Sequence, residues 1–375
     1  MGLRPNLALV RARKQHAWSQ EEVAEKIGTT QANLSRWERG ITTPIPEHLR
    51  QLCVLYQKKP EELFPEAIEG TAASAEVVST GGADPVFWYN MMLPDPAEFY
   101  GREREQQRLF NRVRKAESTS IVGPRRIGKT WLLRYLQLVA PQQLGPQFVI
   151  GYLDATSPTC ATLVGLTTEM LNVLDIPLPS DGSTEANLRA LQAGVKELRA
   201  SGRLPILCID EFEGVCKTPD FRLEFLEYLR AIAQDGLGLV AASKVPLIDI
   251  AKKKKMKKNM MEQDWQTSPF FNIFMQISLK PFSLQEASRF VQSKGKEAMF
   301  NETECDYLLR YGEYEGQKLW FPLRLQLVGT LLHEDKLLAA QGAPELYRPD
   351  DLDYWQEFEE RVEEAYKGAV RWQNR

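Results

Sequence analysis

The chain has 375 residues, which is typical of two or three domains, and its 43% apolar and 26% charged residues are typical of a globular protein. The five cysteines include no CxxC pair, which disfavours a disulfide framework or a zinc module, so a reducing cytoplasm is expected. The three histidines are not spaced as metal ligands, which disfavours metal catalysis on protein ligands. No apolar run is long enough for a membrane span and the N-terminus lacks the apolar core of a secretory signal, so no membrane partner is expected.

The net charge of −3 is distributed unevenly along the chain. Residues 1–65 carry ten Lys and Arg against seven Asp and Glu, whereas residues 66–98 carry six acids and no cation. The remaining residues carry 37 cations and 37 acids. This profile predicts a small basic domain at 1–65, an acidic flexible linker at 66–96 and a larger neutral region after it.

Two short helices are predicted in the first region. Ser19 can cap the first helix, with Glu22 completing a capping box, and Gly28 supplies the turn to a second helix at about 31–39. The helical period predicts a shared apolar core made by Val23, Ala24, Ile27, Leu34 and Trp37. The outward polar face of the second helix contains Gln31, Ala32, Ser35, Arg36 and Arg39. Two helices with a tight turn and a cationic outer face are typical of a helix-turn-helix that enters a DNA major groove.

The segments SQEEVA, GTTQ and SRWERG resemble the Cro/phage-repressor (XRE-type) helix-turn-helix family over about 60 residues. The resemblance implies double-stranded DNA as partner, with base-edge contacts from Gln31 and Arg36 and an apolar contact from Ala32. It also implies phosphate contacts from Gln20 and Arg39. A helical domain for protein docking is the alternative, and the small positive charge favours DNA binding by a homo-oligomer.

After the linker segment 71–85, apolar runs alternate with amphipathic helices. The expected strands are 118–123, 148–155, 205–212, 237–243 and 274–279, and the expected helices begin near Lys129, Ala161, Glu185 and Phe221. Strands alternating with helices predict an α/β fold with a parallel sheet covered on both faces. From about Ser283 the pattern is all-helical, to a last helix at about 351–372. The aromatic stretch 87–92 is expected to dock onto the surface of this region.

A phosphate-binding motif, GxxxxGK[ST], spans Gly123–Thr130 between a predicted strand and a predicted helix. Its glycines allow backbone N–H groups to surround phosphates at a helix N-terminus. Lys129 is therefore expected to reach the β- and γ-phosphates of ATP, and the Thr130 hydroxyl to bind Mg²⁺. The residues expected to bind the nucleotide here are Gly123, Pro124, Arg125, Arg126, Ile127, Gly128, Lys129, Thr130 and Trp131.

A second motif lies about 80 residues later, where the apolar strand 205–212 delivers two acids. Beside a phosphate loop, Asp210 is expected to complete the Mg²⁺ site and Glu211 to activate the attacking water, with Glu213 as the alternative. The two motifs resemble the Walker A and Walker B motifs of AAA+ and STAND-type ATPases.

Three further segments resemble those families between about residues 97 and 335. Phe99–Glu103 is similar to their N-terminal FxGRexE motif, which implies that Tyr100, Gly101 and Arg102 lie near adenine. Ser243 matches the sensor-1 position, with Lys244 where an arginine is usual. The segment 321–327 resembles the lid motif, which implies nucleotide contacts from Pro322 and Arg324, although Arg324 could equally lie on a helix surface. The resemblance implies an ATPase core at 97–282 and a helical lid with C-terminal helices at 283–375.

The expected function is an ATP-dependent DNA-binding protein whose conformation or self-assembly is switched by ATP, as a regulator or a STAND-like signalling or defence ATPase. A DNA-coating AAA+ remodelling or transposition-helper ATPase is one alternative, and a DNA-bound scaffold with little hydrolysis is another. Six lysines within 252–258 could bind DNA phosphates or form a solvated loop. The activating signal and any protein partner stay open.

Overall fold

The computed structural model describes residues 6–371, apart from 17, 28, 30, 39–45, 57, 65–84, 90, 219–220, 222, 251–268, 315 and 343. Most of the predicted linker and the lysine run at 252–258 therefore lie outside the described residues. The chain divides into two compact units, Met1–Gly82 and Ala83–Arg375. No helix within the described ranges is long and apolar enough to cross a membrane.

The first unit is helical, and its predicted core is confirmed. Its helices are α1 (Leu7–Gln15), α2 (Gln20–Lys26), α3 (Gln31–Glu38), α4 (Pro46–Tyr56) and α5 (Pro60–Leu63). Ser19 and Glu22 form the capping box at the start of α2. The residues predicted to be shared between α2 and α3 are all buried, namely Val23, Ala24, Ile27, Leu34 and Trp37. The tight pairing of these two helices follows from that shared apolar face.

A buried acid holds the helices of the first unit together. Glu38 is only 4% exposed and accepts hydrogen bonds from Arg13 Nε at 2.5 Å and Gln20 Nε2 at 2.7 Å. These bonds join α1, α2 and α3, because each of the three side chains comes from a different helix. A buried carboxylate is stable when it is paired in this way.

The second unit contains a five-stranded sheet in the order β2-β3-β4-β1-β5, with every pair parallel. The strands are β1 (Thr119–Val122), β2 (Phe148–Asp154), β3 (Leu204–Asp210), β4 (Gly238–Ser243) and β5 (Met275–Ser278). They lie within one or two residues of the predicted ranges. Strand β4 lies between β3 and β1, and all three strands are parallel. Their carboxyl ends therefore lie at the same edge of the sheet, and the two predicted motifs, which follow β1 and β3, meet there.

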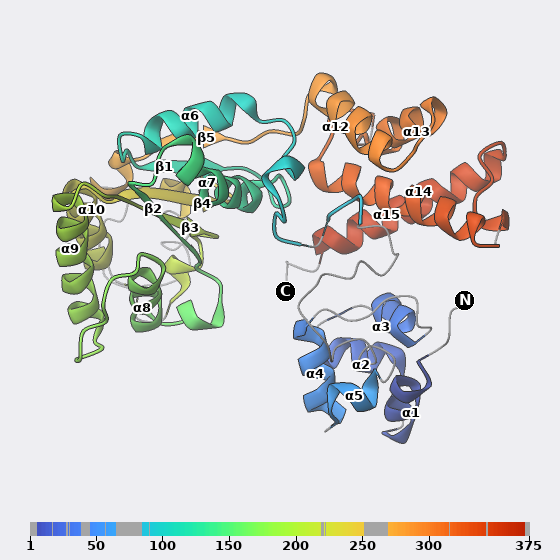
Figure 1. Ribbon diagram of the computed structural model, residues 1–375, viewed down its shortest axis with the longest axis horizontal. Coiled ribbons are helices and arrows are strands. Elements are labelled where there is room, and N and C mark those ends of the chain that lie inside the picture. The colour runs from blue at the N-terminus through green and yellow to red at the C-terminus, as the bar shows by residue number, and fades with distance from the viewer. Residues whose placement is uncertain are drawn as a thin grey trace. The chain divides into compact units, whose positions relative to one another are not determined.

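Helices cover both faces of the sheet, as predicted (Figure 1). One face packs against α6 (Glu103–Val113) and α7 (Lys129–Gln143), and the other packs against α8 (Leu163–Val173), α9 (Thr184–Ala200) and α10 (Leu223–Gln234). Strand β3 illustrates the alternation, since Ile206 and Cys208 join one apolar cluster while Leu207 and Ile209 join the other.

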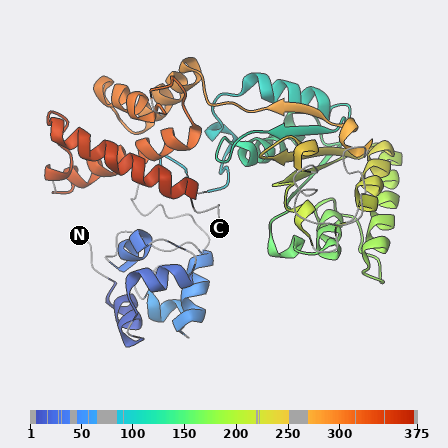
Figure 2. The same ribbon diagram turned by 180° about the vertical axis from the view of Figure 1, so that it is seen from behind.

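The remaining helices pack around a core of their own, and we keep the name lid for this region. They are α12 (Leu284–Glu297), α13 (Glu302–Gly312), α14 (Pro322–Ala340) and α15 (Leu352–Arg371), and α14 and α15 lie side by side (Figure 2). Their apolar faces bury Phe290, Leu325, Trp355 and Phe358 in one cluster. This cluster also takes in Phe87, which comes from the segment before the sheet.

The segment 85–92 belongs to the second unit, although the sequence assigned it to the linker. Phe87 is 6% exposed and stacks on Phe300 with ring centroids 5.9 Å apart. A Cβ at Gly329 of α14 would lie 2.1 Å from the Phe87 ring, so only glycine leaves room for this side chain. The segment therefore docks onto the lid, which agrees with the docking expected for the aromatic stretch.

Candidate functional site

The loop after β1 is closed around the Lys129 side chain. Gly128 precedes α7 with φ of +100°, a conformation that glycine adopts readily. Lys129 is 5% exposed, and its Nζ donates to the carbonyl oxygens of Gly123 and Pro124, both at 3.0 Å. Burial lowers the pKa of Lys129, and the nearby carboxylates of Glu211 and Asp210 oppose that effect. The loop thus holds a desolvated cation at its centre.

Carboxylates from β3 face this lysine. Asp210 is 2% exposed, and its carboxylate accepts from the Thr130 hydroxyl, from the Glu211 backbone N–H at 2.9 Å and from Tyr152 Oη at 3.2 Å. Burial raises the pKa of Asp210, and the hydrogen bond from Thr130 opposes this rise. The two predicted Mg²⁺ ligands, Thr130 and Asp210, are therefore in direct contact.

Glu211 and Glu213 have different surroundings. Glu211 lines the cavity described below, and burial raises its pKa while Lys129 lowers it. By contrast, Glu213 Oε1 accepts from the Lys244 backbone N–H at 2.5 Å. Of the two predicted catalytic carboxylates, Glu211 is thus the one at the cavity wall.

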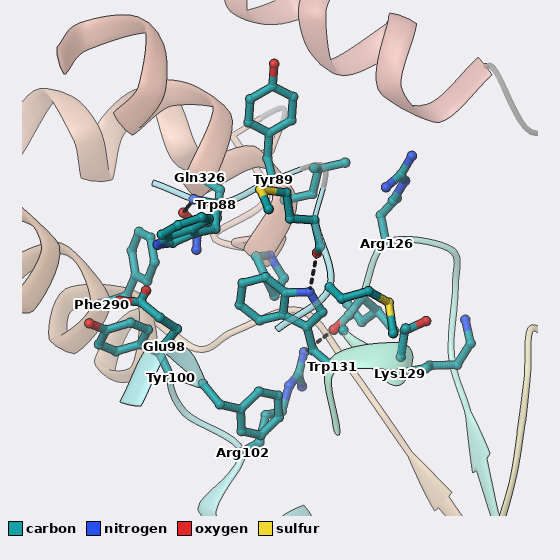
Figure 3. A pocket seen from close by; sticks show the side chains of 18 of the residues that line it. Trp88, Tyr89, Glu98, Tyr100, Arg102, Arg126, Lys129, Trp131, Phe290 and Gln326 are labelled. Atoms are coloured by element: carbon teal, nitrogen blue, oxygen red, sulfur yellow. Dashed lines mark hydrogen bonds between the residues drawn. The ribbon is translucent and has the colours of Figure 1, made fainter. Parts of the chain in front are cut away.

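A cavity of about 330 Å³ lies between the loop and the lid. Figure 3 shows Lys129 and Arg126 on one side of it, and Trp88, Tyr100 and Phe290 on the other. We call these the loop side and the aromatic side. The lining residues are Trp88, Tyr89, Met91, Met92, Glu98, Phe99, Tyr100, Arg102, Arg126, Ile127, Gly128, Lys129, Thr130, Trp131, Glu211, Phe282, Phe290, Pro322, Leu323 and Gln326. A nucleotide needs this combination of apolar walls and a few convergent polar groups.

Arg102 connects the loop to the lid junction. It is 3% exposed, and its guanidinium donates to the Ile127 carbonyl at 3.0 Å and to the Lys280 carbonyl. Its backbone N–H donates to Glu286, a residue of α12, at 3.3 Å. Burial lowers the pKa of Arg102, and the guanidinium lies 4.9 Å from the Phe282 ring centroid. Arg102 therefore fixes the loop relative to the start of the lid.

A buried lysine supports the aromatic side. Lys294 of α12 is fully buried and donates to Glu98 at 2.8 Å and to Glu297 at 2.6 Å. Tyr100 packs its ring edge-on against Phe290 at 5.3 Å, and its hydroxyl donates to Glu297 at 3.2 Å. Hydrogen bonds to the two carboxylates raise the pKa of Lys294 despite burial. Glu98 and Tyr100 are thereby held at the cavity wall.

The segment 88–92, which we call the strap, forms part of the cavity wall. Trp88 N donates to Gln326 Oε1 at 2.8 Å, and Trp131 Nε1 donates to the Met91 carbonyl at 3.0 Å. The strap is thus tied both to α14 and to the first turn of α7. Sequence reasoning missed the cavity-lining role of the strap, Glu98, Phe290 and Gln326, and it missed the contact of Tyr152 with Asp210. No motif marks the strap, Glu98 or Tyr152, and the lid motif at 321–327 implied contacts from Pro322 and Arg324 rather than from Gln326.

The structure brings most predicted nucleotide residues to the cavity. Tyr100, Arg102, Arg126, Ile127, Gly128, Lys129, Thr130, Trp131, Glu211 and Pro322 line it. Asp210 does not line the cavity, but its carboxylate accepts a hydrogen bond from Thr130, which does. The other predicted residues of these loops also lie outside the lining, namely Gly101, Gly123, Pro124 and Arg125.

Two predicted residues are engaged elsewhere. Arg324 is 3% exposed, donates to the Tyr311 carbonyl at 2.9 Å and pairs with Glu363 at 2.6 Å, because α15 covers this face of α14. Ser243 is fully buried, and its hydroxyl donates to the Val245 carbonyl at 2.7 Å. Its backbone carbonyl accepts from Gly123 N at 3.3 Å, so Ser243 lies beside the loop but outside the cavity lining.

The predicted DNA-contact residues are described only in part. Gln31 is exposed at the start of α3, whereas Gln20 donates to Glu38 at 2.7 Å and is half-buried. Ala32, Ser35 and Arg36 belong to α3, but their side chains lie outside the described part of the chain, as does the whole of Arg39.

Family comparisons agree with both units. Residues 9–63 match a helix-turn-helix model, and residues 112–248 match an AAA domain model. No curated protein matches the chain. The chain therefore combines a helix-turn-helix region with an AAA-type P-loop NTPase region.

Two solved structures share the fold. The Aeropyrum pernix ORC2 protein, in its ADPNP-ADP complexes, is 16% identical with a TM-score of 0.54, covering 74% of this chain and 71% of that one. The Walker-type ATPase PABY2304 of Pyrococcus abyssi is 17% identical with a TM-score of 0.52, covering 75% of this chain and 76% of that one. At these identities the likeness establishes the fold and not the function.

Proposed function

We propose that the protein binds ATP and Mg²⁺ in the cavity, hydrolyses ATP, and uses the bound nucleotide to control its action at double-stranded DNA. The residues present fit this ligand. Lys129 is a desolvated cation whose described partners are two loop carbonyls at 3.0 Å, which phosphate oxygens can replace. Thr130 and Asp210 offer adjacent oxygen ligands of the kind that Mg²⁺ prefers. The ADPNP-ADP complexes of the similar ORC2 protein support the same ligand class.

Glu211 is the proposed catalytic base. When bound, Mg²⁺ supplies charge neutralisation on the β- and γ-phosphates. Lys129 adds a second positive charge there, while the Glu211 carboxylate orients the attacking water and accepts its proton. The raised pKa of Glu211 supports this assignment, because a base works best when its pKa approaches the working pH.

The observation that carries the proposed coupling is the position of the strap. The strap directly follows Phe87 and comes soon after residues 65–84, which lead from the helix-turn-helix unit and lie outside the described part of the chain, and four of its residues line the nucleotide cavity. Trp131 directly follows the proposed phosphate and metal residues Lys129 and Thr130, and its Nε1 donates to the Met91 carbonyl of the strap at 3.0 Å. A difference at the γ-phosphate can therefore reach the strap, and with it the chain that leads to the DNA-binding unit. Bound nucleotide thereby acts as a switch.

The DNA-binding role is assigned to α3 of the first unit. Arg36 is proposed to contact a guanine, and Arg36→Ala should cost about 1–3 kcal/mol at a selected site and relax the preference at one base pair. Equal loss on every duplex would remove the base-reading role from Arg36.

The coupling is tested with a 30-base-pair duplex selected by the full chain from a random pool. Fluorescence anisotropy measures its affinity with ATP, with ADP and without nucleotide, for the native chain, Glu211→Gln and Lys129→Ala. We expect the DNA affinity of Glu211→Gln to stay at its ATP-bound value as long as ATP is present. The DNA affinity of Lys129→Ala should be the same with ATP, with ADP and without nucleotide. Identical DNA affinities in all states would contradict the switch.

Electron microscopy of the same samples separates the rival functions, because ATP-dependent filaments on DNA favour a DNA-coating oligomer. Discrete particles favour a regulator or STAND-like switch. Unchanged particle size and DNA binding when turnover is lost favour a scaffold.

A further inference from the structure

Tyr152 of β2 reaches the carboxylate of the proposed Mg²⁺ site from outside the cavity. Its hydroxyl donates to Asp210 Oδ2 at 3.2 Å, and the Glu211 backbone N–H donates to the other oxygen, Oδ1, at 2.9 Å. Asp210 is only 2% exposed, so these donors replace water around its charge. A buried carboxylate with both oxygens held in this way has little freedom to rotate.

The register of the sheet determines where this hydroxyl lies. Strands β2 and β3 are parallel neighbours, with Tyr152 opposite Cys208 and Asp154 opposite Asp210. Residues two apart in a strand share a face, so Tyr152, Cys208 and Asp210 lie on the same face of the sheet. The Tyr152 hydroxyl meets Asp210 because the long side chain spans this two-residue step.

Helix α7 fixes the tyrosine ring from above this face. The guanidinium carbon of Arg134 lies 5.3 Å from the centroid of the Tyr152 ring, and the ring packs against the apolar cluster that β3 and α7 share. Arg134 follows Thr130 by four residues, so the two side chains lie on the same face of α7 in successive turns. The helix that supplies Thr130 to the site therefore also holds the residue that supports Asp210.

A phenol is suited to this supporting position. It donates a hydrogen bond without carrying charge, so it stabilises the ionised carboxylate and leaves the negative charge available for a cation. Each carboxylate oxygen can accept two bonds, so the donors from Tyr152 and Glu211 N leave Asp210 able to bind a further partner. Groups that orient a metal ligand in this way affect metal affinity although they do not contact the metal.

We propose that Tyr152 is a positioning residue for Asp210, which holds the carboxylate in the orientation that binds Mg²⁺. This inference rests on the proposed function and deepens it. It assigns Tyr152 to metal affinity, and it leaves nucleotide affinity to the phosphate loop and water activation to Glu211.

Tyr152→Phe tests the assignment, because it removes the hydroxyl and keeps the ring beside Arg134. Mn²⁺ serves as the probe for Mg²⁺ and is titrated into the full chain with one equivalent of ADP, while electron paramagnetic resonance measures the free ion. We expect Tyr152→Phe to lower the Mn²⁺ affinity about tenfold. Isothermal titration of ADP in EDTA should give the native affinity, because no metal is involved in that measurement.

Tyr354→Phe is the matched control. Tyr354 is also a buried tyrosine whose hydroxyl donates to a buried aspartate, Asp335 Oδ2, at 2.8 Å, but this pair lies in the core of the lid. Loss of its hydrogen bond should lower the Tm and leave the Mn²⁺ affinity at the native value. The comparison therefore separates a positioning role from a contribution to folding alone.

Asp210→Asn provides the reference, since it removes the charge of the proposed ligand itself and should lower the Mn²⁺ affinity further than Tyr152→Phe does. Native Mn²⁺ affinity in Tyr152→Phe, an equal loss in Tyr354→Phe, or a loss of ADP affinity in EDTA would each overturn the assignment. If Asp210→Asn still loses Mn²⁺ binding in those cases, the proposed function stands and only the role of Tyr152 fails. Native Mn²⁺ affinity in Asp210→Asn would overturn the proposed metal site together with this assignment.

Discussion

The loop side and the aromatic side of the cavity are built in opposite ways. On the loop side, one continuous segment, 126–131, and one carboxylate from the end of β3 supply the wall. On the aromatic side, the strap, the segment 98–102, α12 and α14 each contribute one to four residues. The first construction depends on neighbouring strands of a parallel sheet, and the second depends on how the lid packs.

This difference separates two kinds of binding energy. The loop side offers charges and hydrogen bonds that act on phosphate, and their geometry is fixed locally by the sheet. The aromatic side offers apolar surface for a base, and its geometry changes whenever the lid or the strap moves. Substitutions on the two sides should therefore affect different ligands and different steps.

The largest effect is expected from Glu211→Gln on the loop side. Glutamine keeps the shape of the side chain but removes the charge and the basicity, so ATP turnover should fall by about 10²- to 10⁴-fold. ATP affinity should stay close to the native value, because the carboxylate acts on water rather than on bound phosphate. A coupled phosphate-release assay and titration of ATP measure both quantities. Normal turnover would transfer the role to Glu213.

Lys129→Ala should be next in size. Loss of a charge-assisted contact should lower the affinity for ATP by about 100-fold, and the affinity for inorganic tripolyphosphate should fall equally since no base is involved. Displacement of a fluorescent ATP analogue measures both ligands. If tripolyphosphate binding survived while ATP binding was lost, the lysine would not be the phosphate contact.

Trp88→Ala on the aromatic side should have a smaller and more selective effect. The substitution removes the indole but keeps the backbone N–H that donates to Gln326. Loss of one aromatic wall should weaken ATP about tenfold and leave tripolyphosphate unaffected. The same displacement assay applies, and equal weakening of both ligands would show that the two sides are not separable.

The smallest effect near neutrality concerns pH. Glu211 must be deprotonated to act as a base, and because its pKa is raised, turnover at saturating ATP-Mg²⁺ should begin to fall at a higher pH than an ordinary glutamate would allow. The residual turnover of Glu211→Gln should lack this fall. Saturating Mg²⁺ is required since the raised pKa of Asp210 weakens metal binding in the same direction.

The same contrast explains how far the sequence could predict the site. The loop-side residues follow from a motif whose spacing is dictated by the chemistry of phosphate binding, and the strands around it follow from short apolar runs. All five strands, the capping box at Ser19 and the core of the first unit can be derived from local sequence patterns. These features depend on residues that are close together in the chain.

The aromatic side could not be derived in this way. Trp88 meets Gln326 across 238 positions, and nothing in either neighbourhood indicates the other. Arg324 shows the opposite error, in which a local motif implied a contact that the fold does not make. The lid motif implied a nucleotide contact, but the Arg324 guanidinium pairs with Glu363 of α15 instead. Pairing between distant segments is decided by tertiary packing, on which local patterns carry no information.

A substitution at Gly329 should affect the position of the strap without changing any residue that lines the cavity. It lies on α14, outside the cavity lining, and the ring of Phe87 fills the space that its missing side chain leaves. Any other residue at this position must push Phe87 out, and the strap then loses the anchor that precedes it. A substitution at position 329 would therefore differ from one in the phosphate loop or in the helix-turn-helix, because it would leave the residues of both in place and release only the anchor of the strap on the lid.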